Sequence, residues 1–221
     1  MNKVRIWDIP TRLFHWTLVL LVSVSFYTGL NGGIAEMDYH MLCGYAVLAC
    51  ICFRIGWGFI GGKYARFTQF VKGPRAVYTS IHQLFDRDSP SYPGHNPLGA
   101  LSIIAMLAIL LVQAITGLFS NDDILLEGPL VPLVSDETSR DFTGIHKLNK
   151  WLIGGLIVLH LTAIAFHRIV RNERLVLPMI NGIKKLDIKE PPTLLRLEIA
   201  KGIILILICS ALVYALVTWA W

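Results

Sequence analysis

The stretch His146-KLNKWLIGGLIVL-His160 places two histidines at the two ends of one apolar segment, fourteen residues apart. In an α-helix this interval brings both imidazoles to nearly the same side, about 21 Å apart along the helix axis. A neutral imidazole is a strong metal ligand, and burying one in an apolar layer without a partner costs free energy. The stretch therefore predicts one long helix that carries two ligand positions at two depths.

The rest of the chain has the composition of a membrane protein. Of its 221 residues, 54% are hydrophobic and 16% are charged, and this composition excludes an ordinary soluble domain. Backbone groups in lipid must hydrogen-bond within their own segment, so the membrane-crossing parts are expected to be helical. We predict an all-α integral membrane protein, in which a four-helix transmembrane bundle is followed by a fifth, C-terminal transmembrane helix. The five apolar windows are 13–30, 41–60, 98–119, 148–166 and 202–219.

Positive charge is concentrated in alternate connections between these windows. Seventeen of the twenty Lys and Arg residues lie in three regions. These are the residues before the first window, the stretch between Arg54 and the start of the third window, and the residues after the fourth window. The other connections are acidic, with residues such as Glu36, Asp38, Asp122 and Asp123. By the positive-inside rule the N-terminus is cytoplasmic, and five crossings place the C-terminus in the periplasm. The net charge of +5 follows from this topology, and we expect no nucleic-acid binding.

Neither the first window nor the cysteines suggest processing or metal binding. The first window is long and has no small-residue cleavage site of the A-x-A type, so we expect it to remain as a membrane helix. The cysteines show no spacing typical of a zinc site or of covalent haem attachment. We expect them to be small packing residues. They are Cys43, Cys50, Cys52 and Cys209.

The connection 61–97 is the longest, and it is both basic and aromatic. It is either an ordinary basic loop or contains a helix along the cytoplasmic surface, at about 74–85. Gly73-Pro74, Ser89-Pro90 and Pro93-Gly94 are expected to form turns. His82 and His95 also lie in this connection, where we expect both to be solvated loop residues.

Four of the five remaining histidines form pairs when they are ordered by depth. His15 lies near the cytoplasmic start of the first window and His40 near the external start of the second, while His146 is external and His160 lies about four turns deeper. Depth therefore pairs His40 with His146, which can hold an external or outer haem. It pairs His15 with His160, which can hold an internal or inner haem. Two axial histidines fill both faces of a haem iron, which favours electron transfer over oxygen chemistry. The pattern predicts a haem-binding four-helix bundle, that is, a b-type cytochrome with two b haems.

Two alternatives to this assignment stay open. His167 lies seven residues after His160 on nearly the same helical side, so geometry alone allows it to replace His160 as the ligand. The histidines could also be structural, in which case the chain would be a helical bundle without redox function. An absorption spectrum without reduced b-haem bands would favour that reading.

Several motifs resemble the bacterial cytochrome b561 family, which includes the b-type cytochrome subunits of nickel–iron hydrogenases. The resemblance covers roughly residues 3–182. In that family a four-helix core binds two b haems through histidines on the first, second and fourth spans, which implies the ligands His15, His40, His146 and His160. The motifs are Arg12-Leu13-Phe14-His15-Trp16 with Thr28-Gly29, His40-x-x-x-Gly44-Tyr45, Arg54-x-x-Trp57-Gly58-Phe59, Asn96-Pro97-Leu98-Gly99, Gln113-x-x-Thr116-Gly117, and His146 with His160.

Residues near these histidines are candidates for supporting roles. Arg12 and Arg54 lie at the cytoplasmic end, where a guanidinium can pair with haem propionates, and Lys147 could do so outside. The alternative is that these residues are ordinary interfacial charges. Gly44, one turn after His40, is the preferred haem-contact glycine, although close helix packing would explain it equally well.

The function that we expect is electron transfer across the bacterial inner membrane, between the quinone pool and a redox partner. The family resemblance implies a periplasmic partner such as a hydrogenase or a cytochrome c. We expect an electron-transfer subunit rather than a stand-alone enzyme, with a quinone site near Arg12, His167 and Arg168. The alternative is a stand-alone superoxide:quinone oxidoreductase, in which cationic residues near the outer haem attract the anion. Membrane lipid is a further partner, and a homo-oligomer is left open. The cationic residues are Arg140, Lys147 and Lys150.

We divide the chain into a di-haem cytochrome b domain, 1–182, and a cytoplasmic connection with the fifth helix, 183–221. Pro191-Pro192 is expected to stop any helix before the last span begins. No repeat of 20 to 50 residues is visible. Tyr27-Thr28-Gly29 and Ile115-Thr116-Gly117 are only a faint echo between the first and third spans.

Overall fold

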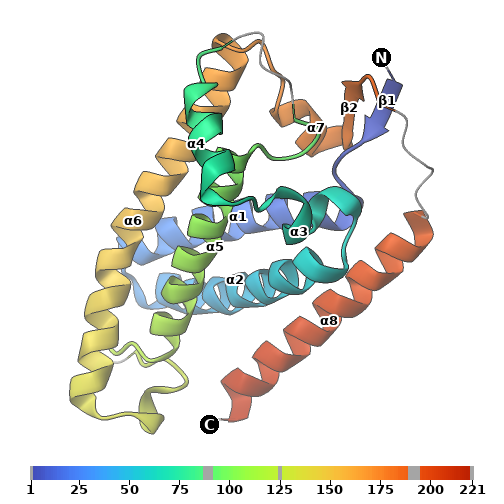
Figure 1. Ribbon diagram of the computed structural model, residues 1–221. Coiled ribbons are helices and arrows are strands. Elements are labelled where there is room, and N and C mark those ends of the chain that lie inside the picture. The colour runs from blue at the N-terminus through green and yellow to red at the C-terminus, as the bar shows by residue number, and fades with distance from the viewer. Residues whose placement is uncertain (1, 87–91, 124–125, 189–194, 220–221) are drawn as a thin grey trace. The chain divides into compact units, whose positions relative to one another are not determined.

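Five long helices account for most of the chain in the computed structural model, which describes residues 2–86, 92–123, 126–188 and 195–219 (Figure 1). All five are long and apolar enough to cross a membrane. This finding confirms the all-α membrane class and the number of spans predicted from hydropathy. The helices are α1 (Ile9–Asn31), α2 (Ile34–Ile60), α5 (Pro97–Leu118), α6 (Asp136–Ile169) and α8 (Leu195–Trp219).

Helix α6 is longer than the apolar window 148–166 that predicted it. Its first turn contains Asp136 and Glu137, and its last turn contains His167 and Arg168. Acidic groups at the N-terminus and basic groups at the C-terminus complement the helix dipole, so polar residues extend the helix beyond its apolar part. His146 and His160 therefore lie on one continuous helix, as their spacing predicts.

The connections contain short elements. The predicted helix in the long basic connection is present as α4, which has Pro74 in its first turn and ends at His82, three residues before Phe85. An antiparallel pair of strands, β1 and β2, was not predicted. The predicted turn at Ser89-Pro90 and the stop at Pro191-Pro192 lie outside the described residues. The short elements are β1 (Asn2–Arg5), η1 (Lys63–Ala65), α3 (Phe67–Phe70), α4 (Pro74–His82), η2 (Val131–Leu133), α7 (Val176–Asn181) and β2 (Ile183–Leu186).

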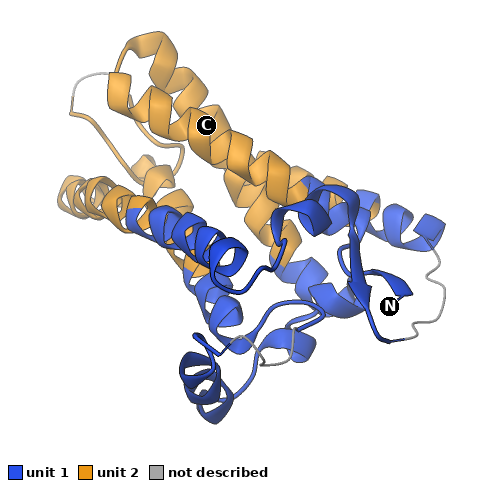
Figure 2. Ribbon diagram, turned by 90° about the horizontal axis from the view of Figure 1, so that it is seen from above, with its two compact units in different colours: residues 1–13, 55–105, 155–203 blue, residues 14–54, 106–154, 204–221 orange. Residues whose placement is uncertain are grey.

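The chain forms two compact units, and each long helix contributes one end to each unit (Figure 2). Unit 1 comprises residues 1–13, 55–105 and 155–203, and it contains the N-terminal strand and the basic connections. Unit 2 comprises residues 14–54, 106–154 and 204–221, and it contains the two acidic connections. Strand β2, which follows the predicted domain boundary at residue 182, pairs with β1 within unit 1.

Asp8 organises the N-terminus of α1 within unit 1. One carboxylate oxygen accepts a hydrogen bond from the Thr11 backbone N–H at 2.7 Å, which caps the helix. The other oxygen accepts bonds from Trp57 Nε1 and from the Gly62 N–H, both at 3.1 Å. Asp8 is buried and Trp57 is completely buried, so this one carboxylate joins the start of α1 to the end of α2.

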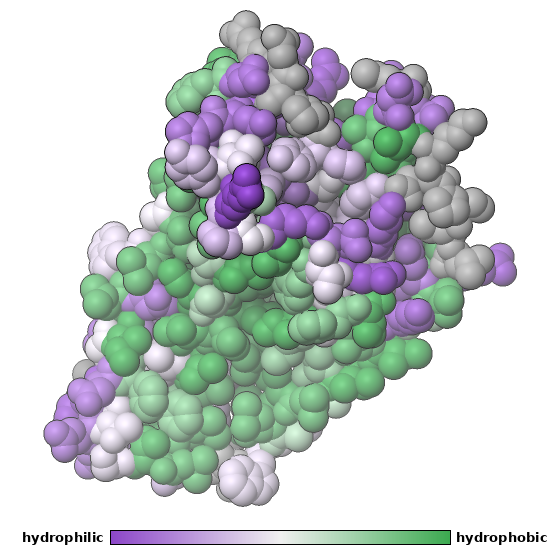
Figure 3. All heavy atoms as spheres, in the orientation of Figure 1, coloured by the Kyte–Doolittle hydropathy of each residue, from purple (hydrophilic) through white to green (hydrophobic). Residues whose placement is uncertain are grey.

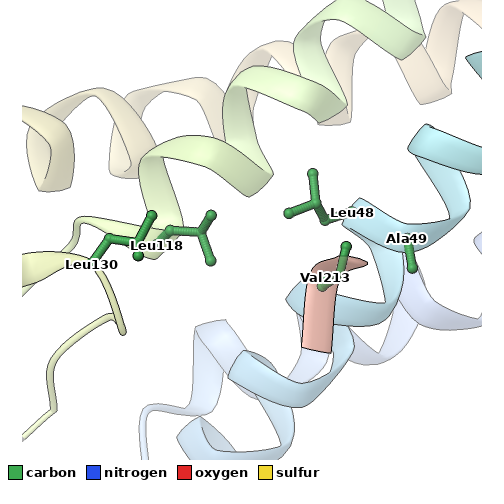
Figure 4. Close-up of a cluster of buried hydrophobic side chains, with 5 residues drawn as sticks. All are labelled: Leu48, Ala49, Leu118, Leu130 and Val213. Carbon is green, nitrogen blue, oxygen red and sulfur yellow. The ribbon is translucent and has the colours of Figure 1, made fainter. Parts of the chain in front are cut away.

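The core of unit 2 is apolar and includes the fifth helix. Figure 4 shows Val213 of α8 in the same cluster as Leu48 and Ala49 of α2, Leu118 of α5 and Leu130. Elsewhere the long helices expose large apolar side chains such as Leu20 and Leu212, and the visible surface over these helices is mainly hydrophobic (Figure 3). Exposed apolar helix surface is what lipid requires, so this is a multi-pass membrane protein.

Candidate functional site: a histidine pair on α2 and α6

His40 and His146 lie opposite each other in unit 2. Their ring centroids are 6.0 Å apart and the ring planes are nearly perpendicular, at 83°. The two side chains come from α2 and α6, near the N-terminal ends of both helices. The structure thus brings together the two histidines that the depth argument assigned to the external position.

Backbone and hydroxyl oxygens of α1 hold the His40 ring. Nδ1 lies 2.9 Å from the Ser25 carbonyl oxygen and 3.5 Å from Thr28 Oγ1. The Thr28 hydroxyl donates its own hydrogen to the Val24 carbonyl at 2.8 Å, so it can only accept from the imidazole. A carbonyl oxygen cannot donate, so Nδ1 carries the hydrogen and Nε2 keeps its lone pair.

His146 is held in the same way by α5. Its Nδ1 lies 3.0 Å from the Gln113 carbonyl oxygen and 3.3 Å from Thr116 Oγ1. The Thr116 hydroxyl donates to the Val112 carbonyl at 2.8 Å. The imidazole therefore again donates from Nδ1, and its Nε2 is the basic nitrogen.

A second set of contacts gives the same assignment for His146. The Asn149 amide nitrogen donates to the Ile109 carbonyl at 3.0 Å, which fixes the orientation of that amide. The same nitrogen donates to Gln113 Oε1 at 2.9 Å, so the other end of the Gln113 amide is its nitrogen. This nitrogen lies 3.0 Å from His146 Nε2, which must accept. The Gln113 side chain has to turn away before Nε2 can bind a metal.

A model of the family described as "Prokaryotic cytochrome b561" matches residues 6–182. The chain belongs to the prokaryotic cytochrome b561 family. Among its relatives, the "Probable Ni/Fe-hydrogenase 1 B-type cytochrome subunit" of Escherichia coli (strain K12) is 25% identical over 210 residues, which cover 81% of this chain and 89% of the relative.

A second relative is the "Probable Ni/Fe-hydrogenase B-type cytochrome subunit" of Azotobacter chroococcum mcd 1. It is 25% identical over 213 residues, which cover 82% of this chain and 88% of the relative. The protein of the same name from Cupriavidus necator is 24% identical over 216 residues, which cover 81% and 86% of the two chains. No solved structure matches the chain. Membership in the b561 family makes haem b the expected cofactor.

The histidine pair fits the haem of a b561 cytochrome. Two imidazoles that bind one metal ion from opposite sides, at about 2 Å per bond, have ring centres roughly 6 Å apart, and the observed separation is 6.0 Å. A metal-binding histidine normally donates its other ring N–H to a fixed acceptor, as both rings do here. A Cβ atom added at Gly44, one turn after His40, would meet nothing within 4 Å, so this side of α2 leaves room for a flat group.

The second predicted pair is divided between the units. His15 lies on the part of α1 in unit 2, half-buried, with its ring 5.0 Å from that of Trp16. His160 lies on the part of α6 in unit 1 and is also half-buried. In this b561 cytochrome the pairing of His15 with His160 therefore stays a prediction.

His167, the alternative ligand, belongs to an ionic cluster at the end of α6. Its Nδ1 lies 2.9 Å from a Glu173 carboxylate oxygen. The other carboxylate oxygen lies 3.9 Å from Lys184 Nζ, which donates to the Tyr92 carbonyl at 2.8 Å. Desolvation by burial lowers the pKa of Lys184, and the charge of Glu173 opposes this shift.

The two predicted propionate partners lie in different surroundings. Arg12 donates from Nη1 to the Ile180 carbonyl, and its buried Nε has no hydrogen-bond partner among the described residues. Arg54 is only 4% exposed, so it is not the solvated interfacial charge of the alternative reading. The third predicted residue, Lys147, is exposed.

The predicted quinone residues do not form one hydrogen-bonded group in the described part of the chain. Arg12 bonds to Ile180, His167 to Glu173, and Arg168 to the Asn172 side chain at 3.0 Å. The expectation that His95 is solvated is wrong, because its half-buried ring packs 4.6 Å from the Trp7 ring and 5.3 Å from the Phe70 ring. His82 is exposed as expected, although its ring packs 4.3 Å from that of Tyr78.

Sequence analysis assigned no role to the residues that hold His40 and His146 in this b561 cytochrome. Ser25 and Thr28 act from α1, and Gln113, Thr116 and Asn149 act from α5 and α6. Two signals were present in the sequence: Thr28-Gly29 and Gln113-x-x-Thr116-Gly117 were among the motifs of the family resemblance, and the repeated Thr-Gly pair was noted as a faint echo. The role of a Thr-Gly pair depends on which residue of the next long helix packs against it.

Proposed function

We propose that this b561 cytochrome is a di-haem electron-transfer subunit that connects a periplasmic redox partner with quinone in the bilayer. The observation that carries the proposal is the His40–His146 pair, whose imidazole rings lie 6.0 Å apart, each with Nδ1 hydrogen-bonded and Nε2 basic. A b haem held by this pair would supply reversible one-electron transfer at its iron. His15 and His160 would hold the second haem.

The chain's own residues would orient the haem and shield it from reaction. His40 and His146 would hold the haem iron from both sides, and a haem held in this way would supply electron transfer without oxygen chemistry. The apolar cluster that contains Leu48 and Leu118 would provide a low-dielectric environment in unit 2. Gly44 would contact the porphyrin face, while Arg12 and Arg54 would pair with propionates of the inner haem.

A hydrogenase is the partner that we favour. The two relatives described from Escherichia coli and Azotobacter chroococcum are both named as Ni/Fe-hydrogenase cytochrome subunits, and this chain aligns with more than four-fifths of each. A periplasmic cytochrome c remains the second choice. The distribution of Lys and Arg supports a bacterial inner-membrane protein with its N-terminus in the cytoplasm and its C-terminus in the periplasm.

Quinone would exchange electrons at the cytoplasmic end. The support is chemical, because Arg12 offers a buried donor and the His167–Glu173 pair offers a group that can give or take a proton. A quinone needs both electrons and protons to become a quinol. Substitution of Arg12 or His167 with alanine should slow quinone reduction, and His167→Ala should do so with an unchanged haem content. Unaltered kinetics in both variants would contradict this location.

The haem count of the purified protein tests the main proposal. Wild-type protein should contain two b haems per polypeptide by pyridine haemochrome assay. His40→Ala and His146→Ala should each lose the same single haem and leave the other with an unchanged reduced spectrum. A single haem in the wild type, or two intact haems in His146→Ala, would overturn the proposal.

The superoxide:quinone oxidoreductase alternative makes a different kinetic prediction. It requires the purified protein to be reduced rapidly by superoxide without any partner, and Lys147→Gln with Lys150→Gln should slow that reaction. An electron-transfer subunit should instead be reduced by hydrogen only in complex with its hydrogenase. Stopped-flow spectra of the isolated protein and of the complex separate the two functions.

A further inference from the structure

Two seven-residue segments, one on α1 and one on α5, have matching residues at four positions. The segment 24–30 reads VSFYTGL and the segment 112–118 reads VQAITGL. Valine, threonine, glycine and leucine occupy the same places in both. Each segment lies in the last two turns of its helix, and the histidine that it contacts lies on the next long helix in the same unit.

The matching positions make the same contacts with their histidines. In each segment the valine carbonyl receives the threonine hydroxyl hydrogen, at 2.8 Å in both cases. The carbonyl of the second residue, Ser25 or Gln113, accepts from the histidine Nδ1 at 2.9 or 3.0 Å. The threonine hydroxyl oxygen can accept from the same Nδ1–H, at 3.5 Å for Thr28 and 3.3 Å for Thr116. The two sites therefore share one hydrogen-bond pattern.

The glycine of each segment sets how closely the histidine ring approaches the helix. A Cβ atom at Gly29 would lie 2.8 Å from His40 Cε1 and 2.9 Å from its Nδ1. A Cβ atom at Gly117 would lie 3.0 Å from His146 Cε1 and 3.3 Å from its Nδ1. Any larger residue would push the ring away from the carbonyl and hydroxyl oxygens.

We infer that Ser25-x-x-Thr28-Gly29 and Gln113-x-x-Thr116-Gly117 are two copies of one histidine cradle, in which Thr28 and Thr116 are positioning residues that lower the reduction potential of the outer haem. This inference rests on the proposed function, because it concerns the haem that His40 and His146 would hold. It adds that the ligands on both sides of that haem are positioned by copies of the same cradle.

The direction of the effect follows from the hydrogen bonds. An acceptor at Nδ1–H draws the hydrogen away from the ring and makes Nε2 a stronger electron donor to the iron. A stronger donor stabilises ferric over ferrous iron, so the reduction potential falls. Each histidine Nδ1–H already donates to a backbone carbonyl oxygen, and the threonine oxygen is its second acceptor. Removal of the threonine hydroxyl should therefore raise the reduction potential, while the carbonyl still holds the ring in place.

Redox titration of the full-length protein in detergent tests the role of the threonines. Thr28→Val and Thr116→Val should each shift the midpoint potential of the outer haem upward and leave the inner haem unchanged. The His146→Ala spectrum identifies which haem is the outer one. Thr28→Ser and Thr116→Ser restore the hydroxyl and should return the potential to the wild-type value. An outer haem with the wild-type potential in both valine variants, or equal shifts of both haems, would overturn the inference.

The glycines give an independent test if the valine variants do not fold. Gly117→Ala should weaken retention of the outer haem by about 10-fold, the size expected when a ligand's supporting contacts are disturbed. Gly144→Ala on α6 is the matched control, since its Cβ would meet nothing within 4 Å, and it should retain both haems. Equal retention in both variants would count against the cradle.

The outcomes also separate this inference from the proposed function. If alanine at His40 and at His146 leaves both haems in place, the proposed ligands are wrong and the function fails with them. If those variants lose one haem but the threonine variants do not move its potential, only the role of the cradle fails.

Discussion

The two units hold their histidines and other buried polar groups by different means. In unit 2, His40 and His146 are held by carbonyl and hydroxyl oxygens, which carry no net charge. In unit 1 the central groups are carboxylates, with Asp8 joining α1 to α2 and Glu173 lying between His167 and Lys184. Neutral acceptors suit a low-dielectric position, where a buried carboxylate would be costly.

Charge follows the same division. Sixteen of the twenty Lys and Arg residues lie in unit 1, which is the half that the positive-inside rule places at the cytoplasmic face. The Glu173 carboxylate there has the Lys184 ammonium nearby, whereas the buried Asp8 carboxylate is satisfied by N–H donors of Thr11, Trp57 and Gly62. The comparison indicates that neutral hydrogen-bond acceptors surround the histidine pair of unit 2, whereas charged groups predominate in unit 1.

The largest expected effect distinguishes the two candidate ligands on α6. If His160 is the proposed ligand of the inner haem, His160→Ala should remove one of the two haems. His167→Ala should keep both haems, since its ring belongs to the Glu173 cluster of unit 1. Haem content per polypeptide decides between them. Loss of a haem from His167→Ala, with two haems retained in His160→Ala, would show that His167 is the ligand. The cluster of His167 and Glu173 would then bind a cofactor, which would contradict the contrast between the two units.

Removal of the Asp8 carboxylate should destabilise unit 1 strongly. Asp8→Ala leaves the buried N–H groups of Trp57 and Gly62 without an acceptor and removes the cap of α1. We expect a loss of about 3 kcal/mol in the free energy of unfolding, because each buried unsatisfied donor costs roughly 1–3 kcal/mol. Unfolding in detergent followed by tryptophan fluorescence measures it. The exposed Asp141 gives the control, and a loss of similar size in Asp141→Ala would contradict the special role of Asp8.

A smaller effect is expected where β2 begins. Gly182 has a φ of +81°, and a Cβ atom there would lie 2.7 Å from the Trp7 carbonyl oxygen. Gly182→Ala should therefore cost about 2 kcal/mol, from the unfavourable backbone conformation and the contact together. Gly73→Ala adds a Cβ that meets nothing within 4 Å and should leave stability nearly unchanged. Equal thermal stability of the two variants would show that the strand pair tolerates displacement.

The smallest expected effect is a shallow pH dependence from Lys184. Burial lowers the pKa of this side chain, so the unfolded chain binds the Lys184 proton more tightly than the folded chain does. Between the lowered pKa and the ordinary lysine value of about 10.4, the free energy of unfolding should rise with pH. Below the lowered pKa both states are protonated and the full cost of burying the charge is present.

Chemical denaturation at a series of alkaline pH values measures this slope. Lys184→Met should abolish it, while Lys185→Met, at the exposed neighbouring position, should preserve it. A slope that persists in Lys184→Met would have to come from another group in unit 1.

Hydropathy and helical periodicity were sufficient to predict five transmembrane helices, because lipid imposes length, apolarity and internal hydrogen bonding on each segment separately. They also predicted that His146 and His160 share one helix, since that relation depends only on the rise per residue. For the long basic connection, the sequence left a surface helix and an ordinary loop open, and the structure has the helix α4 there. The ends of α6 did not follow from hydropathy, because its first and last turns are polar.

The sequence by itself determined the helices, the candidate ligands and their order in depth, since each of these depends on neighbours along the chain. Only the tertiary structure decided that α1 and α5 present carbonyl and threonine oxygens to His40 and His146, that Asp8 reaches Trp57 and Gly62, and that β1 pairs with β2. These contacts join residues far apart in the chain, and their geometry depends on how helices pack. A residue pattern such as Thr-Gly acquires its role only from the side chain that packing places against it.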